Sequence, residues 1–456
     1  MRVNELIEVD ITDNGMNFEG IGRYDDKVVF VPGAIAGERV QARIVKDTQN
    51  YTLAKMENIL VKSNDRKYED CMSYHGCGGC TAQHINYDRT LDIKKNIVKN
   101  SLKKQGIDEK LVNSIYGMGI PYNYRNKVQY PVRNIKGRNI FGMFSEKSHK
   151  LIEVHNCQIQ DKYINEIAKY MFECINKENI SCYNEEKKIG DLKNIMVRRG
   201  IHTDEVLCIF VVTNEKMASS KEMKSVANML VEKYDNIKGV IANVNGAKGN
   251  VILGNKNIVL YGEDRITDKI GNNTYYISTN SFFQVNTIMA EVLYTVLDNM
   301  LNLDKSETLL ELYSGVGTIG IFLADKVKEI YGVEIVEDAV KMAEDNVELN
   351  NITNAKYTAG DAKIELEKLQ RQNVYFDTLI VDPPRKGLDE EGIDIIMKLK
   401  PKKIGYVSCN PATLARDLNK LSELYNIDKI NLVDMFPWTS HVESVAVLKI
   451  NRSIEK

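Results

Sequence analysis

The sequence lacks any long apolar run. Its longest apolar stretches, such as VLCIFVV (Val206–Val212), fall far short of the roughly 20 residues that a bilayer-spanning helix needs. The N-terminal stretch MRVNELIEVDITDNG also lacks the apolar core of a secretion signal. We therefore expect a cytoplasmic protein with no membrane partner.

An excess of charge of one sign is also missing. The 61 Lys and Arg residues balance 63 Asp and Glu residues, which gives a net charge of −2. Net charge thus gives no support for a polyanionic partner, and any basic surface has to be local. Because 43% of the 456 residues are hydrophobic and 27% are charged, the composition predicts a compact protein of two or three domains.

Cysteine, in contrast, is informative. Three of the eight cysteines crowd into CMSYHGCGGC with C-x5-C-x2-C spacing, among glycines that let the backbone curl around one centre. Disulfides are unusual in a cytoplasmic chain, so this spacing indicates a metal site. Cys157 could supply a fourth thiolate for an iron–sulfur site, whereas His75 or His84 would suit zinc. Spacing alone leaves both metals open. The three clustered cysteines are Cys71, Cys77 and Cys80.

The pattern of strands and helices divides the chain. Residues 1–60 read as short strands with turn glycines, which predicts a small OB-like β-barrel of the kind that often binds RNA. Residues 61–88 and 121–275 mix helices with strands, including VILG at 251–254, and predict an α+β central domain. Strands and helices alternate from residue 308 onward, so we assign 89–120 and 276–456 to an α/β domain with a parallel sheet. Residues 91–105 have helical apolar spacing, and their lysines should form a solvated face.

A glycine-rich turn opens the α/β domain. TLLELYSGVGTIG has a G-x-G-x-x-G pattern between a strand and a helix, and the next strand ends near Glu334. Such a turn permits close approach to a nucleotide, and the acidic residue suits a ribose diol. The pattern alone fits either a dinucleotide or S-adenosylmethionine. Further along, the strand in FDTLIVDPPRKG ends at Asp382, which Pro383 and Pro384 hold at the carboxyl edge of the sheet.

The segment YVSCNPATLARD places a cysteine at that same edge. Cys409 follows a strand and precedes a helix, with Asn410 as its expected N-cap and Pro411 as its first residue. The positive end of the helix dipole favours a thiolate, which a nucleophile requires. A dehydrogenase has no evident need for this cysteine beside Asp382, whereas a group-transfer enzyme does.

A thiolate beside a methyl donor has a specific use with pyrimidines. Addition of the thiolate to carbon 6 makes carbon 5 nucleophilic enough to accept a methyl group, and a base then removes the carbon 5 proton. Glu443 leads into the last apolar strand and is the candidate base, and His441 is its competitor. Uracil suits this site better than cytosine, because a carboxylate can accept a hydrogen bond from uracil N3.

Five segments in this order resemble the RNA uracil-5-methyltransferase family: SFFQVN, ELYSGVGTIG, DPPRKG, SCNPATLARD and HVES. The full-chain layout is most similar to the 23S ribosomal RNA branch that carries a 4Fe–4S cluster. This resemblance implies an N-terminal TRAM barrel, a central iron–sulfur domain and a C-terminal Rossmann-like class I methyltransferase domain. One departure is Glu311, where aspartate is more usual.

The resemblance also assigns roles to residues. It implies Cys409 as the nucleophile and Glu443 as the base, with Asp361 near the adenine of the methyl donor. The residues that it implies for S-adenosylmethionine are Gln284, Tyr313, Glu334 and Asp382, of which Gln284 and Asp382 could instead contact the uracil base. Those that it implies for the 4Fe–4S cluster are Cys71, Cys77, Cys80 and Cys157.

The implied partner is folded RNA, with the target uridine flipped into the pocket of a monomeric enzyme. The expected reaction is methylation of 23S ribosomal RNA. The same reaction on the T-loop uridine of transfer RNA is one alternative, and a non-enzymatic RNA-binding or redox-sensing role is another. Intact Cys409 and Glu443 speak against the last. Candidate phosphate contacts are Arg125, Lys127, Arg133, Lys136, Arg138, Arg198 and Arg199.

Overall fold

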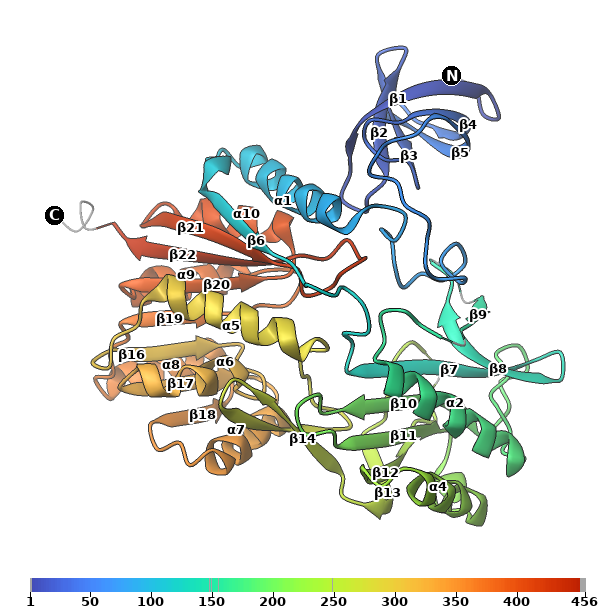
Figure 1. Ribbon diagram of the computed structural model, residues 1–456. Helices are drawn as coiled ribbons and strands as arrows, with labels where there is room; N and C mark the ends of the chain where they lie inside the picture. Colours follow the sequence, from blue (N-terminus) through green and yellow to red (C-terminus); the bar gives the residue numbers. More distant parts are fainter. Residues whose placement is uncertain (1, 147, 149, 155, 248, 452–456) are drawn as a thin grey trace.

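The computed structural model describes residues 2–451 except 147, 149, 155 and 248. Figure 1 shows a small barrel in blue, a central α+β part mainly in green, and a C-terminal α/β part coloured yellow to red. None of the helices in the described part of the chain combines the length and apolarity that crossing a bilayer requires.

The N-terminal strands close into a barrel in the order β1-β2-β3-β5-β4. Alternate residues such as Ile7, Val9 and Ile11 of β1 point into the barrel core, as the period-two pattern requires. The expected barrel is therefore confirmed. Its strands are β1 (Leu6–Asn14), β2 (Gly20–Tyr24), β3 (Lys27–Val31), β4 (Arg39–Asp47) and β5 (Tyr51–Val61).

Arg66 fastens the barrel to the cysteine-rich segment that follows it. Its guanidinium donates to the two carboxylate oxygens of Glu38 at 2.6 and 2.8 Å, and also to the carbonyl of Gly33. Glu38 is buried, and bidentate pairing of this kind is both strong and directional. The cysteine-rich segment therefore starts from a fixed point on the barrel.

The central part is built on a seven-stranded sheet in the order β13-β12-β11-β10-β7-β8-β9. Helices α2 and α4 pack on it through an apolar core that includes Ile164, Phe210 and Leu230. The sequence predicted such a mixture of helices and strands for this part. The elements are β7 (Lys127–Ile135), β8 (Arg138–Phe144), β9 (Leu151–Glu153), α2 (Lys162–Lys177), β10 (Leu192–Arg199), β11 (Val206–Val212), α3 (Glu215–Ala218), α4 (Lys221–Lys233), β12 (Ile237–Val244) and β13 (Lys256–Gly262).

The prediction of a strand at residues 251–254 is wrong. This segment is irregular, and the edge strand β13 begins only at Lys256. Side chains compete with the sheet for its backbone: Asn245 donates to the carbonyls of Val251 and Ile252, and Asn243 donates to that of Gly254. Asparagine side chains readily replace ladder hydrogen bonds in this way.

The C-terminal part is an eight-stranded sheet in the order β18-β17-β16-β19-β20-β22-β21-β6, with helices on both faces. Leu309, Ile380 and Val407 belong to the core on the face covered by α5 and α7. Their neighbours Leu310 and Leu379 belong to the opposite core, to which α1, α9 and α10 contribute. Both faces of the sheet are therefore buried, and the expected α/β architecture is confirmed.

The strands β16 to β20 of this sheet run parallel, whereas β22 runs antiparallel to both of its neighbours. A two-stranded ribbon, β14 (Arg265–Ile270) and β15 (Asn273–Ser278), precedes the sheet in the chain. The remaining elements are α1 (Tyr87–Lys104), η1 (Glu109–Leu111), β6 (Val112–Tyr116), α5 (Thr287–Leu301), β16 (Thr308–Leu312), α6 (Thr318–Phe322), η2 (Ala324–Lys326), β17 (Glu329–Glu334), α7 (Glu337–Leu349), β18 (Ala355–Ala359), α8 (Ala362–Arg371), β19 (Thr378–Val381), α9 (Glu390–Leu399), β20 (Lys403–Ser408), α10 (Pro411–Leu421), β21 (Tyr425–Val433) and β22 (Glu443–Ile450).

Candidate active site and four-cysteine pocket

One edge of the large sheet collects most of the expected site residues. Tyr313, Asp382 and Cys409 directly follow the parallel strands β16, β19 and β20, and Glu334 ends β17. Glu443 begins the antiparallel strand β22 and so lies at the same edge. In open α/β sheets, ligands bind outside the carboxyl ends of the strands.

The glycine-rich turn has the backbone geometry of a nucleotide-binding loop. Gly315 and Gly317 have φ values of +54° and +77°, and Tyr313, which is not a glycine, has a φ of +61°. A side chain held in this left-handed region costs about 1–3 kcal/mol and persists only where the surroundings fix it. Glu334 braces the turn, because its carboxylate accepts hydrogen bonds from the amides of Gly315 and Val336 at 3.0 Å each.

Glu311 supports the same turn from the core. It accepts hydrogen bonds from the Gly320 amide at 3.1 Å and from the Tyr357 hydroxyl at 3.4 Å. Burial raises the pKa of Glu311 to about 8. A Cβ atom at Gly320 would lie 2.5 Å from the Glu311 carboxylate oxygen and 2.5 Å from the Tyr357 hydroxyl oxygen, so glycine is required there. Glu311 thus positions the loop instead of presenting a free carboxylate.

Two further candidate cofactor-binding residues, Gln284 and Asp361, lie in segments that hydrogen bonds hold in place. The carbonyl of Gln284 accepts a hydrogen bond from the Asn126 side chain at 2.9 Å, which ties its loop to the start of β7. Asp361 caps α8, because its Oδ1 accepts from the amides of Lys363 and Ile364.

The turn at Cys409 forms as expected. Asn410 caps α10 by accepting from the Ala412 amide at 3.1 Å, and Pro411 is the first helical residue. Asn410 also donates to the carbonyl of Arg385 at 2.9 Å. This bond ties the loop after Asp382 to the Cys409 turn, so the two strand ends are held together.

Strand pairing brings Cys409 and Glu443 close together. Antiparallel pairing of β20 with β22 opposes Val407 to Val445 and Ser408 to Ser444. Ser408 and Ser444 are the last pair, and Cys409 and Glu443 are the residues next to it on the two chain segments. The Glu443 carboxylate is close enough to interact electrostatically with the Cys409 thiol. Glu443 is buried, whereas Cys409 is partly exposed.

The electrostatics of this pair differ from the sequence expectation. Burial, together with the neighbouring carboxylates of Glu443 and Asp382, raises the pKa of the Cys409 thiol to about 11, against the opposing effect of Arg385. The expectation that the helix N-terminus would favour the thiolate is therefore corrected, because desolvation and two carboxylates outweigh it. Burial also raises the pKa of Asp382 to about 7.

Glu443 is a stronger base than an ordinary carboxylate. Burial raises its pKa to about 8, the nearby Asp382 contributes to the rise, and the cations Arg385 and Lys94 act against it. His441, the competing base, has its Nε2 3.1 Å from the Arg385 guanidinium, which can only donate. The lone pair of that nitrogen is therefore engaged, and burial also lowers the pKa of His441.

Lys94 is a residue that sequence reasoning missed. It was expected on the solvated face of its helix, but it is completely buried, and its ammonium lies 2.5 Å from Asp434 and 3.1 Å from the carbonyl of Phe436. A buried lysine needs such partners. The only sequence signal was its position next to the apolar Ile93 in the helical repeat, because its partner Asp434 is remote in the chain.

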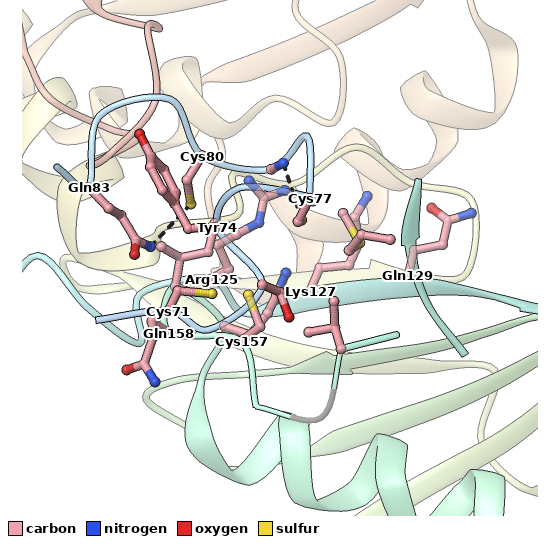
Figure 2. Close-up of a pocket in the computed structure, with 16 residues that line it drawn as sticks. Cys71, Tyr74, Cys77, Cys80, Gln83, Arg125, Lys127, Gln129, Cys157 and Gln158 are labelled. Atoms are coloured by element: carbon pink, nitrogen blue, oxygen red, sulfur yellow. Dashed lines mark hydrogen bonds between the residues drawn. The ribbon is translucent and has the colours of Figure 1, made fainter. Parts of the chain in front are cut away.

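The four expected cluster cysteines line one pocket of about 330 Å³. Figure 2 shows the sulfur atoms of Cys71 and Cys157 pointing toward each other across it, with Cys77 and Cys80 on the neighbouring loop. Neither of the alternative zinc ligands is among the lining residues, and the Nδ1 of His84 is engaged with the Tyr74 hydroxyl at 2.7 Å.

The donor set of this pocket suits an iron–sulfur cluster. Four thiols surround one space, and Arg125 and Lys127 add positive charge to its wall. Among the described residues, Arg125 Nε and Gln129 Nε2 are buried donors without a hydrogen-bond partner, as an anionic group would require. No three His, Cys, Asp or Glu side chains of the described ranges are arranged to hold a metal ion.

Burial disfavours thiolates in this pocket as it stands. It raises the pKa of Cys80 to about 12, and it also raises the pKa values of Cys77 and Cys157. Thiolate ligands are stabilised when metal ions lie between them.

Several candidate phosphate contacts are engaged in protein contacts instead. Arg198 is buried and donates to the carbonyl of Ser281 at 2.7 Å. Arg133 is buried beside Glu185, and Arg138 donates to Glu153. Of the other candidate phosphate contacts, Arg199 is paired with Asp161 and Asp204. Lys136 is exposed in a hairpin turn, and Arg125 and Lys127 line the cysteine pocket.

Fold, glycine turn and strand-edge residues together define a class I methyltransferase. Two family profiles match the chain: the tRNA (Uracil-5-)-methyltransferase family over residues 86–451 and the TRAM domain over residues 2–56. The chain therefore belongs to the uracil-5 RNA methyltransferase family that carries a TRAM domain. Its reaction is the S-adenosylmethionine-dependent methylation of uracil C5 in RNA.

Similar proteins match over nearly the full length. An uncharacterized RNA methyltransferase of Clostridium acetobutylicum is 40% identical over 453 residues, which cover 98% of each chain. Another, of Caldanaerobacter subterraneus subsp. tengcongensis, is 40% identical over 98% of this chain and 99% of the relative. Among solved structures, the Pyrococcus abyssi tRNA (uracil-54, C5)-methyltransferase in complex with S-adenosyl-L-homocysteine has a TM-score of 0.77, with 29% identity over 97% of this chain and all of that one.

Proposed function

We propose that this protein methylates a uridine of 23S ribosomal RNA at C5 through a covalent adduct between Cys409 and C6. The observation that carries this proposal is that Cys409 and Glu443 lie close together at the ends of the paired strands β20 and β22. A nucleophile and a base must both reach one pyrimidine ring, and the closeness of the Cys409 thiol to the Glu443 carboxylate supports these roles. A purely RNA-binding or redox-sensing role gives no reason for that arrangement.

The chain's residues divide the reaction between them. Cys409 Sγ, once deprotonated, bonds to C6 and pushes electron density to C5. S-adenosylmethionine would supply the methyl group that C5 accepts, and S-adenosylhomocysteine would be the leaving group. Glu443 then takes the C5 proton, the electrons restore the C5–C6 double bond, and the Sγ–C6 bond breaks. The pKa of about 8 gives Glu443 the basicity that removal of this proton needs.

The cofactor assignments are part of the same proposal. Gln284, Tyr313, Glu334 and Asp382 would hold S-adenosylmethionine, with Glu334 on the ribose diol. Two features support them: the left-handed turn at Tyr313, and the carboxylate of Glu334 at the end of β17, where a ribose-binding acid is expected. Asp361 would lie near the adenine.

Cys71, Cys77, Cys80 and Cys157 would hold a 4Fe–4S cluster. We expect anaerobically purified protein to be brown, with roughly four iron and four sulfide per chain, as for Cys₄ ligation. Cys80→Ser should lose most of the iron, and Cys182→Ser, which alters a buried cysteine that does not line the pocket, should retain it. Colourless protein that carries stoichiometric zinc in its place would contradict the assignment.

The four-cysteine pocket supports ribosomal RNA as the substrate, by resemblance to the branch that carries a cluster. The second candidate is the T-loop uridine of transfer RNA, supported by full-length similarity to the Pyrococcus abyssi enzyme. Mapping of 5-methyluridine in both RNAs from a strain that lacks this protein separates the two. We expect a position in 23S RNA to lose its methyl group and transfer RNA to keep its own. The reverse pattern would reject the ribosomal assignment.

A further inference from the structure

The connection between β21 and β22 carries the chain to Glu443 and contains Trp438, the protein's single tryptophan. Trp438 is 2% exposed and has a left-handed φ of +65°. A bulky residue remains in that conformation only where its surroundings over-determine it. What fixes Trp438 therefore also fixes the start of β22.

Two segments that flank the four-cysteine pocket supply this fixation. The amides of Thr81 and Ala82, immediately after Cys80, donate to the Trp438 carbonyl at 2.8 and 3.1 Å. On the other side, the indole Nε1 of Trp438 donates to the carbonyl of Pro121 at 2.6 Å.

Tyr124 adds a second bond from that side. Its hydroxyl donates to the Pro437 carbonyl at 3.0 Å, and it precedes Arg125 of the pocket wall. Tyr124, Ile159 and Trp438 form one buried apolar cluster, against which Cys80 and Cys157 pack. The cysteine pocket and the connection to Glu443 thus share one packed unit.

We infer that Trp438 is a positioning residue through which the four-cysteine pocket holds Glu443 close to Cys409. This inference rests on the proposed roles of Cys409 and Glu443. When the Cys80 loop is held in place, the Thr81 and Ala82 amides hold the Trp438 carbonyl. Trp438 in turn fixes the backbone that leads to the start of β22. Loss of the pocket's ligand loosens this contact and slows proton removal from C5 more than it weakens binding of RNA.

The first experiment tests the position of the base. Trp438→Phe keeps an aromatic ring but loses the bond to Pro121, and Tyr124→Phe loses the bond to Pro437. We expect both to lower kcat roughly 10- to 100-fold, as for a misplaced catalytic group. Both should also accumulate the denaturant-stable Cys409–RNA adduct, because Glu443 takes the C5 proton more slowly and the Sγ–C6 bond persists. RNA and S-adenosylmethionine affinities should stay within about twofold of wild type.

The matched control is Tyr163→Phe, which removes a hydroxyl bond to Asn236 within the central part. It should behave as wild type. If the Trp438 and Tyr124 variants release tritium from 5-tritiated uridine at the wild-type rate with no extra adduct, the positioning role is rejected. If wild type itself forms neither 5-methyluridine nor adduct, the proposed function fails instead.

The second experiment reads the coupling without catalysis. Because Trp438 is the single tryptophan, acrylamide quenching of its emission reports directly on this connection. We expect Cys80→Ser to raise the Stern–Volmer constant about twofold or more, as local opening exposes the indole. Cys182→Ser should leave it unchanged. An unchanged constant in Cys80→Ser protein that has lost its iron would overturn the coupling.

Discussion

Replacing Cys409 with alanine should abolish methyl transfer. The proposed adduct cannot form without Sγ, and removal of a covalent nucleophile costs about 10⁴-fold or more in rate. Incorporation of labelled methyl groups from S-adenosylmethionine into RNA measures this loss directly. RNA affinity and cofactor affinity should change little, because Cys409 is one partly exposed side chain at the edge of the site.

Cys174→Ala is the matched control for this variant. Cys174 is a buried residue of α2 in the core of the central part, away from the sheet edge. Its variant also loses a cysteine thiol but should retain wild-type activity. Methylation by Cys409→Ala protein at the wild-type rate would show that C5 is activated without this cysteine.

Replacing Glu443 with glutamine should stop the reaction one step later. The adduct forms and C5 accepts the methyl group, but the C5 proton has no base, so turnover falls by about 10²–10⁴-fold. An RNA–protein adduct that survives denaturing electrophoresis should accumulate, and tritium release from 5-tritiated uridine should cease. Equal loss of adduct and turnover would contradict the assignment of Glu443 as the base.

The pH dependence gives this prediction a sign. Glu443 acts as a base only when deprotonated, and its pKa is about 8, so wild-type turnover should rise between roughly pH 7 and 9. Glu443 also raises the pKa of Cys409. Its replacement by neutral glutamine should therefore lower that pKa and let the adduct form at lower pH than in wild type. Rapid-quench measurement of adduct formation against pH tests both trends.

Local sequence signals predicted the parts of the site that are built locally. The cap and proline at Asn410 and Pro411 formed as expected, because N-cap chemistry depends on adjacent residues. The glycine turn and the strand ends that carry Glu334 and Asp382 followed from apolar runs with clear limits. The four cysteines of the pocket were predicted from spacing, with Cys157 as a candidate fourth ligand, and the family resemblance then favoured this set over zinc ligation.

Features that depend on residues distant in the chain could not be predicted from the sequence. Lys94 looks like its solvated neighbours until Asp434 approaches it across the fold. In the sequence Arg198 looks like a phosphate ligand, but in the structure it is buried and donates to the Ser281 carbonyl. The raised pKa of Cys409 depends on Glu443 and Asp382, which only sheet register brings together. A helix-dipole argument made from adjacent residues cannot contain those charges.

The most direct test of the account is to identify the residue that becomes attached to RNA. RNA containing 5-fluorouridine should trap the enzyme after methyl transfer, because C5 then carries fluorine in place of the proton that Glu443 removes. Mass spectrometry of the digested adduct should find one modified peptide, with the nucleotide and its new methyl group on Cys409. An adduct on another residue, or methylated RNA with no adduct under these conditions, would contradict the proposed mechanism.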